Sequence, residues 1–336
     1  MKYILEIPPE LADAINQHIR SGKYRSPHDF MMVAIQNQLN TESREEGWAN
    51  LGTQESSAFE TPMTNAIQLL QLHPDLANVK TVPLSDFPRH NYLWGQYNRI
   101  FPVKIVMRVA ANLARINGSE HFPLAELHEK SALFARNLGK TIERAEKSMG
   151  RKRGTIISAG LPIGKGPGAD KAQLRFKSQF VGYMGKDKIE GAAPALKFID
   201  FCKDEKNSLL AGITDFGLKF ASLPNPVIES QDYSTPFSSE EVNFLLNHIA
   251  SEIPEEAKLI RLILSGIKEG TTTPEGLNER MKSFNPKWKK SEPVTMRAGV
   301  VSRISELGLL DRKKHGVKVT YELTKLGEEY LAKLRD

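Results

Sequence analysis

The order of helical and strand-like segments in the C-terminal part of the chain constrains its fold more than any other feature. Apolar residues recur at helical spacing in three stretches, 255–269, 274–281 and 292–307. Residues 309–313 and 318–323 then alternate like two strands around a turn at 314–317, and a further helical stretch follows. This order predicts a fold that is mainly α with short β-strands, in the α+β class.

The same order resembles the winged helix, a variant of the helix-turn-helix of DNA-binding proteins. The resemblance implies that the third helix enters the major groove of double-stranded DNA and that the hairpin lies on the phosphate backbone. The residues then expected to face DNA are small, polar or basic: Thr295, Arg297, Ala298, Gly299, Ser302 and Arg303. The hairpin adds four cations as expected phosphate contacts, Arg312, Lys313, Lys314 and Lys318.

One phrase near the end of this domain occurs twice in the chain. Residues 213–220 and 323–330 share the frame aliphatic, Thr, any residue, apolar, Gly, two variable residues and aromatic. The phrase resembles one found in winged-helix regulators, where Thr caps the closing helix and Gly permits close packing. The sequence therefore predicts a duplicated domain, with an enlarged first copy at 87–224 and a second copy at 241–336.

In the first copy, residues 171–183 are predicted to form the helix that reads DNA. With Leu174, Phe180, Val181 and Met184 placed inward on a helical wheel, the opposite face carries side chains suited to base edges. The expected DNA contacts on that face are Lys171, Arg175, Ser178 and Gln179.

A loop rich in Gly, Lys and Pro, 150–170, precedes this helix. Its run 160–168 suggests a phosphate-binding loop, but it has one residue too few between the glycines and no Ser or Thr after Lys165. We interpret the loop as a flexible basic arm that orders on DNA. Its expected contacts are Arg151, Lys152, Arg153 and Lys165.

The first forty residues predict a strand at 2–7, a helix at 10–21 and a second helix at 26–39. This order, with its Ser-Gly-Lys-Tyr-Arg-Ser turn, resembles the ribbon-helix-helix repressors and antitoxins. The resemblance implies a homodimer through residues 1–40, and whether the paired strands also read DNA stays open. The apolar residues expected at the dimer seam are Tyr3, Leu5, Ile7, Phe30 and Ile35.

Two polar segments are predicted to connect these parts, a linker at 41–86 and a spacer at 225–240.

Charge is distributed unevenly between the parts. Residues 140–188 hold 12 Lys and Arg against 4 Asp and Glu, and residues 282–318 hold 10 against 3, although the whole chain carries only +6. Two basic regions on an otherwise acidic chain are typical of proteins that bind a polyanion.

Several classes of function lack their minimum residues. Cys202 is the only cysteine, so neither an internal disulfide nor a thiolate metal cluster is expected, and the eight histidines show no metal-ligand spacing. No nucleophile elbow or clustered two-metal carboxylate signature appears. We expect no enzyme activity, no cofactor and no metal. With no signal peptide and no membrane-spanning run, we expect a cytoplasmic, nucleoid-associated protein.

These features favour a dimeric protein that binds double-stranded DNA sequence-specifically, most simply a transcriptional regulator. A plasmid replication or partition protein, or the DNA-recognition subunit of a mobile element or defence system, is an alternative. A third hypothesis is a protein-interaction adaptor, since ribbon arms and winged helices also bind protein partners. The sequence does not distinguish these roles or specify the DNA site.

Overall fold

The computed structural model divides the chain into two compact units, 1–60 and 61–336. In the second unit it describes residues 69–151, 156–164, 168–316 and 318–334. In the first unit it describes five residues, all helical and all within the two predicted helices: Ala12, Asp13, Ile15, Asn16 and Pro27. The predicted dimer seam, Tyr3, Leu5, Ile7, Phe30 and Ile35, lies outside the described residues.

The second unit combines helices with small antiparallel sheets, which agrees with the α+β class. Its first half contains η2 Pro74–Asn78, α4 Phe101–Asn117, β1 Phe122–Pro123, α5 Leu124–Ser148, α6 Gly168–Phe176, the π-helical turn η3 Lys177–Val181, β2 Tyr183–Met184, β3 Ile189–Glu190, α7 Ala192–Ala195, β4 Ile199–Lys203, β5 Leu209–Ile213 and α8 Asp215–Ser222. Its second half contains α9 Pro226–Glu229, α10 Ser239–Glu252, α11 Pro254–Lys268, α12 Pro274–Phe284, α13 Glu292–Glu306, β6 Leu310–His315, β7 Lys318–Leu323 and α14 Lys325–Lys333. The predicted order of helices and strands after residue 254 is confirmed.

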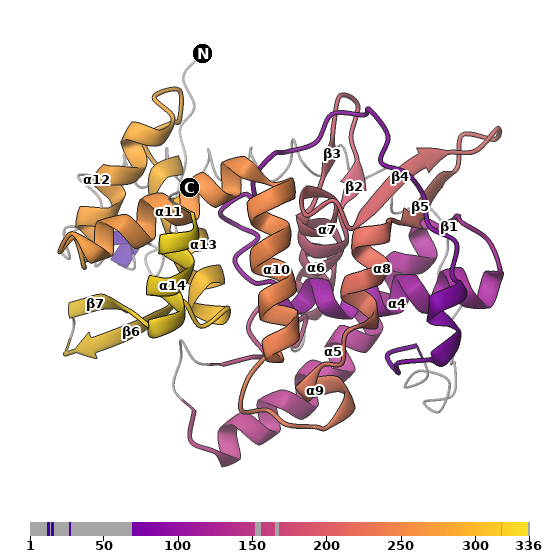
Figure 1. Ribbon diagram of the computed structural model, residues 1–336, viewed down its shortest axis with the longest axis horizontal. Helices are drawn as coiled ribbons and strands as arrows, with labels where there is room; N and C mark the ends of the chain where they lie inside the picture. The colour runs from indigo at the N-terminus through magenta and orange to yellow at the C-terminus, as the bar shows by residue number, and fades with distance from the viewer. Residues whose placement is uncertain are drawn as a thin grey trace. The chain divides into compact units, whose positions relative to one another are not determined.

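Helix α4 lies at the centre of the first half, where α5, α7, α8 and the sheet β1–β5–β4 surround it (Figure 1). Every residue from Phe101 to Ala114 is buried, including a polar stripe at i, i+4 and i+8 formed by Lys104, Arg108 and Asn112. Buried polar groups need partners inside the protein. Lys104 pairs with Glu241 at 2.8 Å, and Arg108 pairs with Glu229 at 2.5 Å.

The polar stripe of α4 also organises segments that the sequence predicts as connections. Asn112 donates to the carbonyl oxygens of Leu69 and Gln71 at 3.1 and 3.2 Å. Residues 69–86 are therefore packed on the core, with Leu76 only 2% exposed. The linker prediction is wrong for this part, because its backbone carbonyl oxygens accept from buried donors of α4 and its few apolar side chains pack on the core.

The two copies of the repeated phrase have the same local structure. Thr214 caps α8 and Thr324 caps α14, each accepting a hydrogen bond from the backbone N–H of the glycine three residues later. Each hydroxyl also donates to a carbonyl oxygen just beyond the helix that precedes the hairpin, that of Lys197 after α7 at 2.7 Å and that of Gly308 after α13 at 2.6 Å. The predicted roles of Thr as a cap and Gly as a close-packing residue are both present, since a Cβ on either glycine would overlap a backbone carbonyl.

The strands around this phrase also correspond. Antiparallel pairing begins with Ile199 opposite Ile213 in one copy and Leu310 opposite Leu323 in the other. The two hairpins are preceded by residues with positive φ, Lys197 at 58° and Gly308 at 76°. The lysine adopts a conformation that glycine reaches without strain, so the same helix end is formed by different residues.

The helix before the hairpin differs strongly between the copies. It is α13, with 15 residues, in the second copy, and α7, with four buried residues, in the first. The prediction of a single helix over 171–183 is also wrong. Those residues form α6, the π-helical turn and the start of β2, and Leu174, expected inward, is 46% exposed while Phe176 is buried.

The buried imidazole of His128 in α5 gives a test of how α5 packs against the segment at Gly182. Its Nε2 lies 2.7 Å from the carbonyl oxygen of Gly182, and burial lowers the pKa of His128 to about 4. The unfolded chain therefore takes up a proton between pH 6.5 and 4 while the folded chain does not, so the free energy of unfolding falls as the pH is lowered through this range.

Replacing His128 with Gln, which still offers an N–H to Gly182, is expected to remove a loss of about 2.5 kcal/mol between pH 7 and pH 4.5. Urea unfolding of both proteins at pH 7 and pH 4.5 measures the difference. Parallel losses in wild type and variant would contradict the prediction.

Candidate nucleic-acid interface

Helix α13, expected to read DNA, has two covered faces. One face carries Met296, Val300 and Ile304, which are fully buried in the core of the second half. A second face crosses the segment 93–97, where a Cβ on Gly299 would overlap the backbone of Gly95. Gly299, expected to permit close approach of a DNA groove, instead permits close approach of the chain's own backbone.

Arg303 lies on this covered face and is 1% exposed. Its guanidinium pairs with Glu256 of α11 at 2.6 Å and donates to the carbonyl oxygens of Leu93, Trp94 and Tyr97. The prediction of Arg303 as a DNA contact is therefore wrong. Its hydrogen bonds are already used to fasten the segment 93–97 to α11 and α13.

The next turn of α13 completes this attachment. The carboxylate of Glu306 accepts hydrogen bonds from the backbone N–H groups of Ile100 at 2.6 Å and Phe101 at 3.3 Å, where α4 begins. Burial raises the pKa of Glu306 above its usual value. Helix α13 is thus fixed to the start of α4 as well as to α11.

The face of α13 that remains open is narrow. Val294 and Ala298 are exposed, while Thr295 and Ser302 are half-buried. Arg297 lies beside them, with its Nε 3.0 Å from Oδ1 of Asn278 and its Nη1 3.4 Å from the hydroxyl of Tyr321. Among the described residues, Arg297 forms no ion pair with a carboxylate, so its charge is held in place without being neutralised.

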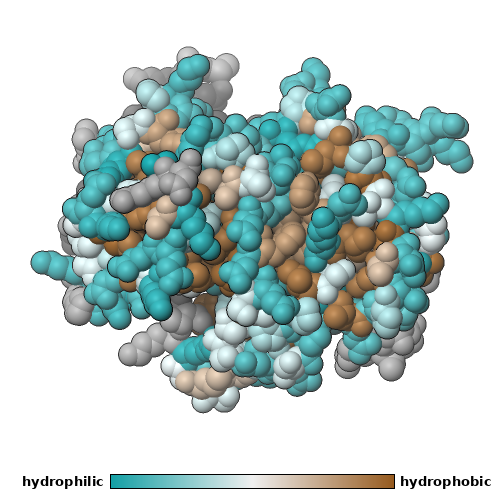
Figure 2. All heavy atoms as spheres, viewed as in Figure 1, coloured by the Kyte–Doolittle hydropathy of each residue, from teal (hydrophilic) through white to brown (hydrophobic). Residues whose placement is uncertain are grey.

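The hairpin β6–β7 divides its cations between two faces. Arg312 is opposite Tyr321 and Lys314 is opposite Val319, so both lie on the face that also carries Arg297's partner Tyr321. Lys313 lies on the other face, 3.9 Å from Asp311 and 3.8 Å from Glu322. Lys318, opposite His315 at the start of β7, is exposed and lies on the same face as Lys313. Figure 2 shows hydrophilic residues over this hairpin.

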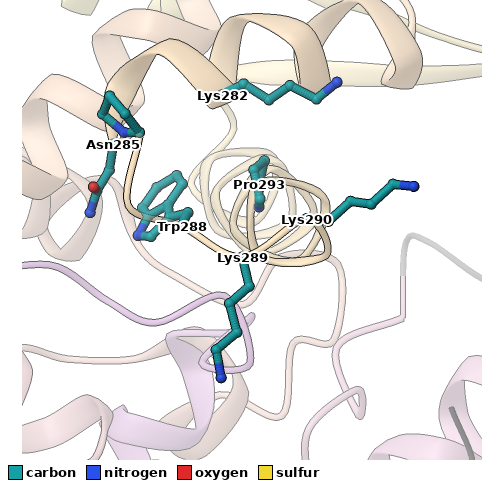
Figure 3. A pocket seen from close by; sticks show the side chains of 7 residues that line it. Lys282, Asn285, Trp288, Lys289, Lys290 and Pro293 are labelled. Carbon is teal, nitrogen blue, oxygen red and sulfur yellow. The ribbon is translucent and has the colours of Figure 1, made fainter. Parts of the chain in front are cut away.

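The turn between α12 and α13 adds cations that were not selected from the sequence. Lys282, Lys287, Lys289 and Lys290 are all exposed. Three of them, together with Asn285, Pro286, Trp288 and Pro293, line a pocket of about 220 Å³ beside the first turn of α13 (Figure 3). Their charge contributes to the basic excess of 282–318. That excess does not show from the sequence that the lysines line a pocket.

The DNA contacts predicted in the first half do not lie on a helix equivalent to α13. Lys171 and Arg175 are exposed on α6, whereas Ser178 and Gln179 are half-buried in the π-helical turn. Arg151 has a side chain only 16% exposed and donates to the carbonyl oxygen of Ser234 at 2.9 Å. The other expected contacts of the loop, Lys152, Arg153 and Lys165, lie outside the described residues.

Within the described residues, no three His, Cys, Asp or Glu side chains are grouped so that they could hold a metal ion. No helix in the described part of the chain is long and apolar enough to cross a membrane.

The difference between Arg303 and the exposed arginines predicts different effects on stability. Arg303→Met leaves Glu256 buried without its partner, which is expected to cost about 3–5 kcal/mol of unfolding free energy. Arg312→Met, at an exposed position, is expected to change it by less than about 0.5 kcal/mol. Urea unfolding measures both, and equal effects would contradict the assignment of Arg303 to the core.

The chain matches no protein-family model, no curated protein and no solved structure.

Proposed function

We propose that this chain binds double-stranded DNA through the exposed face of α13, the hairpin β6–β7 and the turn between α12 and α13. The observation that carries the proposal is the gathering of unneutralised cations around α13. Within the described part of the chain, none of the following side chains forms an ion pair: Lys289, Lys290, Arg297, Arg312 and Lys314. Cations left without carboxylate partners favour an anionic ligand.

The arrangement of these groups suits a duplex. Residues after 254 have the element order of a winged helix, in which the third helix lies in the major groove. Val294 and Ala298 are small or apolar and fit against groove walls or thymine methyl groups, while the surrounding cations reach phosphates. Arg297 is the one arginine on the open part of α13, so we assign it the main part in reading bases.

In this proposal the first half supports the interface without forming a second one. The helix that corresponds to α13 is α7, whose four residues are buried and cannot enter a groove. Each chain then contacts one segment of the DNA groove. The predicted homodimer through residues 1–40 would place a second copy of the interface on a second groove segment. We also propose a role in transcription, which binding to a promoter would test.

The two faces of the hairpin give a first test. Replacing Arg312 and Lys314 with Ala is expected to reduce the slope of log affinity against log salt by about 2, because each phosphate contact contributes about 0.9. Lys313→Ala, on the acidic face, is the control and is expected to leave the slope nearly unchanged. Fluorescence anisotropy with a labelled duplex at several salt concentrations measures the slopes. An equal reduction in the control, or none in the double variant, would contradict the assigned face.

The open face of α13 gives a second test. Ala298→Glu places a carboxylate among the proposed phosphate and base contacts, so duplex affinity is expected to fall at least about tenfold. Ala332→Glu makes the same change at an exposed position on α14 and is expected to alter affinity by less than about twofold. Thermal unfolding checks that both variants fold. Equal affinities of the two variants would remove α13 from the interface.

A further inference from the structure

The pocket between α12 and α13 has two kinds of wall. Figure 3 shows Lys282 and Lys290 extending to one side of it and Lys289 to another, with Trp288 between Asn285 and Pro293. The indole and two prolines, Pro286 and Pro293, give it an apolar side, while the lysines give it a cationic rim. Its volume of about 220 Å³ is more than a single inorganic phosphate fills.

Trp288 is held in place by other aromatic rings. Its ring lies 5.5 Å from that of Phe284 and 6.3 Å, edge to face, from that of Tyr92. The side chain is half-buried, so these contacts leave part of the indole facing the pocket. An aromatic surface fixed by its neighbours loses little conformational entropy when a planar ligand stacks on it.

The polar groups of the pocket are only partly used by the protein. Lys282 pairs with Glu279 at 2.7 Å, and the carboxylate of Glu292 accepts from the backbone N–H of Lys289. Within the described residues, the ammonium groups of Lys289 and Lys290 pair with no carboxylate. Asn285 accepts from the N–H of Lys287 through Oδ1 and keeps its amide donors for a ligand.

We propose that this pocket binds a single nucleotide, with the base against Trp288 and the phosphate at the cationic rim to which Lys282, Lys289 and Lys290 contribute. Stacking on an aromatic side chain contributes about 1–3 kcal/mol per base and does not depend on base identity. A surface that only followed the phosphate backbone would gain nothing from the indole and prolines. An uncharged aromatic ligand would leave the lysines unused.

The nucleotide is either an unstacked nucleotide of a bound nucleic-acid strand or a free mononucleotide. Only the first case rests on the proposed function. The same contacts hold both, so the full chain is titrated with dAMP, with a 5′-phosphorylated four-residue oligodeoxyadenylate and with inorganic phosphate. Calorimetry gives the affinities, and quenching of tryptophan emission reports stacking.

We expect dAMP or the oligonucleotide to bind at least about tenfold more tightly than phosphate and to quench emission. Trp288→Leu should remove that preference, and Trp94→Phe should retain the quenching. Because Trp288→Leu also loses ring contacts, a second variant replaces the exposed Lys289 and Lys290 with Ala. It should weaken nucleotide binding at least about tenfold, whereas the control, Lys268→Ala with Lys333→Ala, should not.

Tight binding of dAMP assigns a free nucleotide as the ligand, and tight binding of the oligonucleotide alone assigns a nucleotide within a strand. Equal affinity for phosphate and both nucleotides, or affinities unchanged by the Lys289 and Lys290 substitutions, would overturn the inference. Duplex binding that persists without nucleotide binding counts against the pocket alone. Nucleotide binding without duplex binding counts against the proposed function alone.

Discussion

The buried pair of Arg303 and Glu256 is the interaction on which the position of α13 depends. Two charges taken out of water are stable together only when their remaining hydrogen-bonding groups are satisfied. The backbone of segment 93–97 supplies those bonds, because Arg303 donates to three of its carbonyl groups and Glu256 accepts from the N–H of Leu93 at 3.0 Å. The pair therefore joins α11, α13 and the approach to α4.

A second buried polar cluster joins the halves from the other side. Lys104 of α4 pairs with Glu241 of α10 and donates to the carbonyl oxygens of Phe220 and Leu223, and burial lowers its pKa to about 8. Asn225, in the predicted spacer, donates to the same Glu241 at 2.9 Å. The spacer is thus part of the packed structure, and the proposed DNA-binding half is held on the first half instead of moving as an independent domain.

These constraints explain why the proposed interface is small. The second half keeps a long helix before its hairpin, but much of that helix is covered by the chain's own backbone at Gly95. The first half has the same caps and strand pairing around a helix too short and too buried to reach a ligand. Similar local structure in the two copies therefore does not give them the same accessible chemistry, and the proposed interface relies mainly on cations around α13.

The sequence by itself determined the helices and strands after residue 254 and the capping of α8 and α14. Those features depend on contacts between near neighbours, such as Thr324 with Gly327, which spacing and residue type reveal. It did not determine which cations stay exposed. Arg297 and Arg303 are chemically alike, yet only Arg303 meets Leu93, 210 residues earlier, and only the tertiary structure brings that backbone to it. Burial is decided by such distant contacts, and for the same reason Trp288 and the neighbouring lysines became a pocket only in three dimensions.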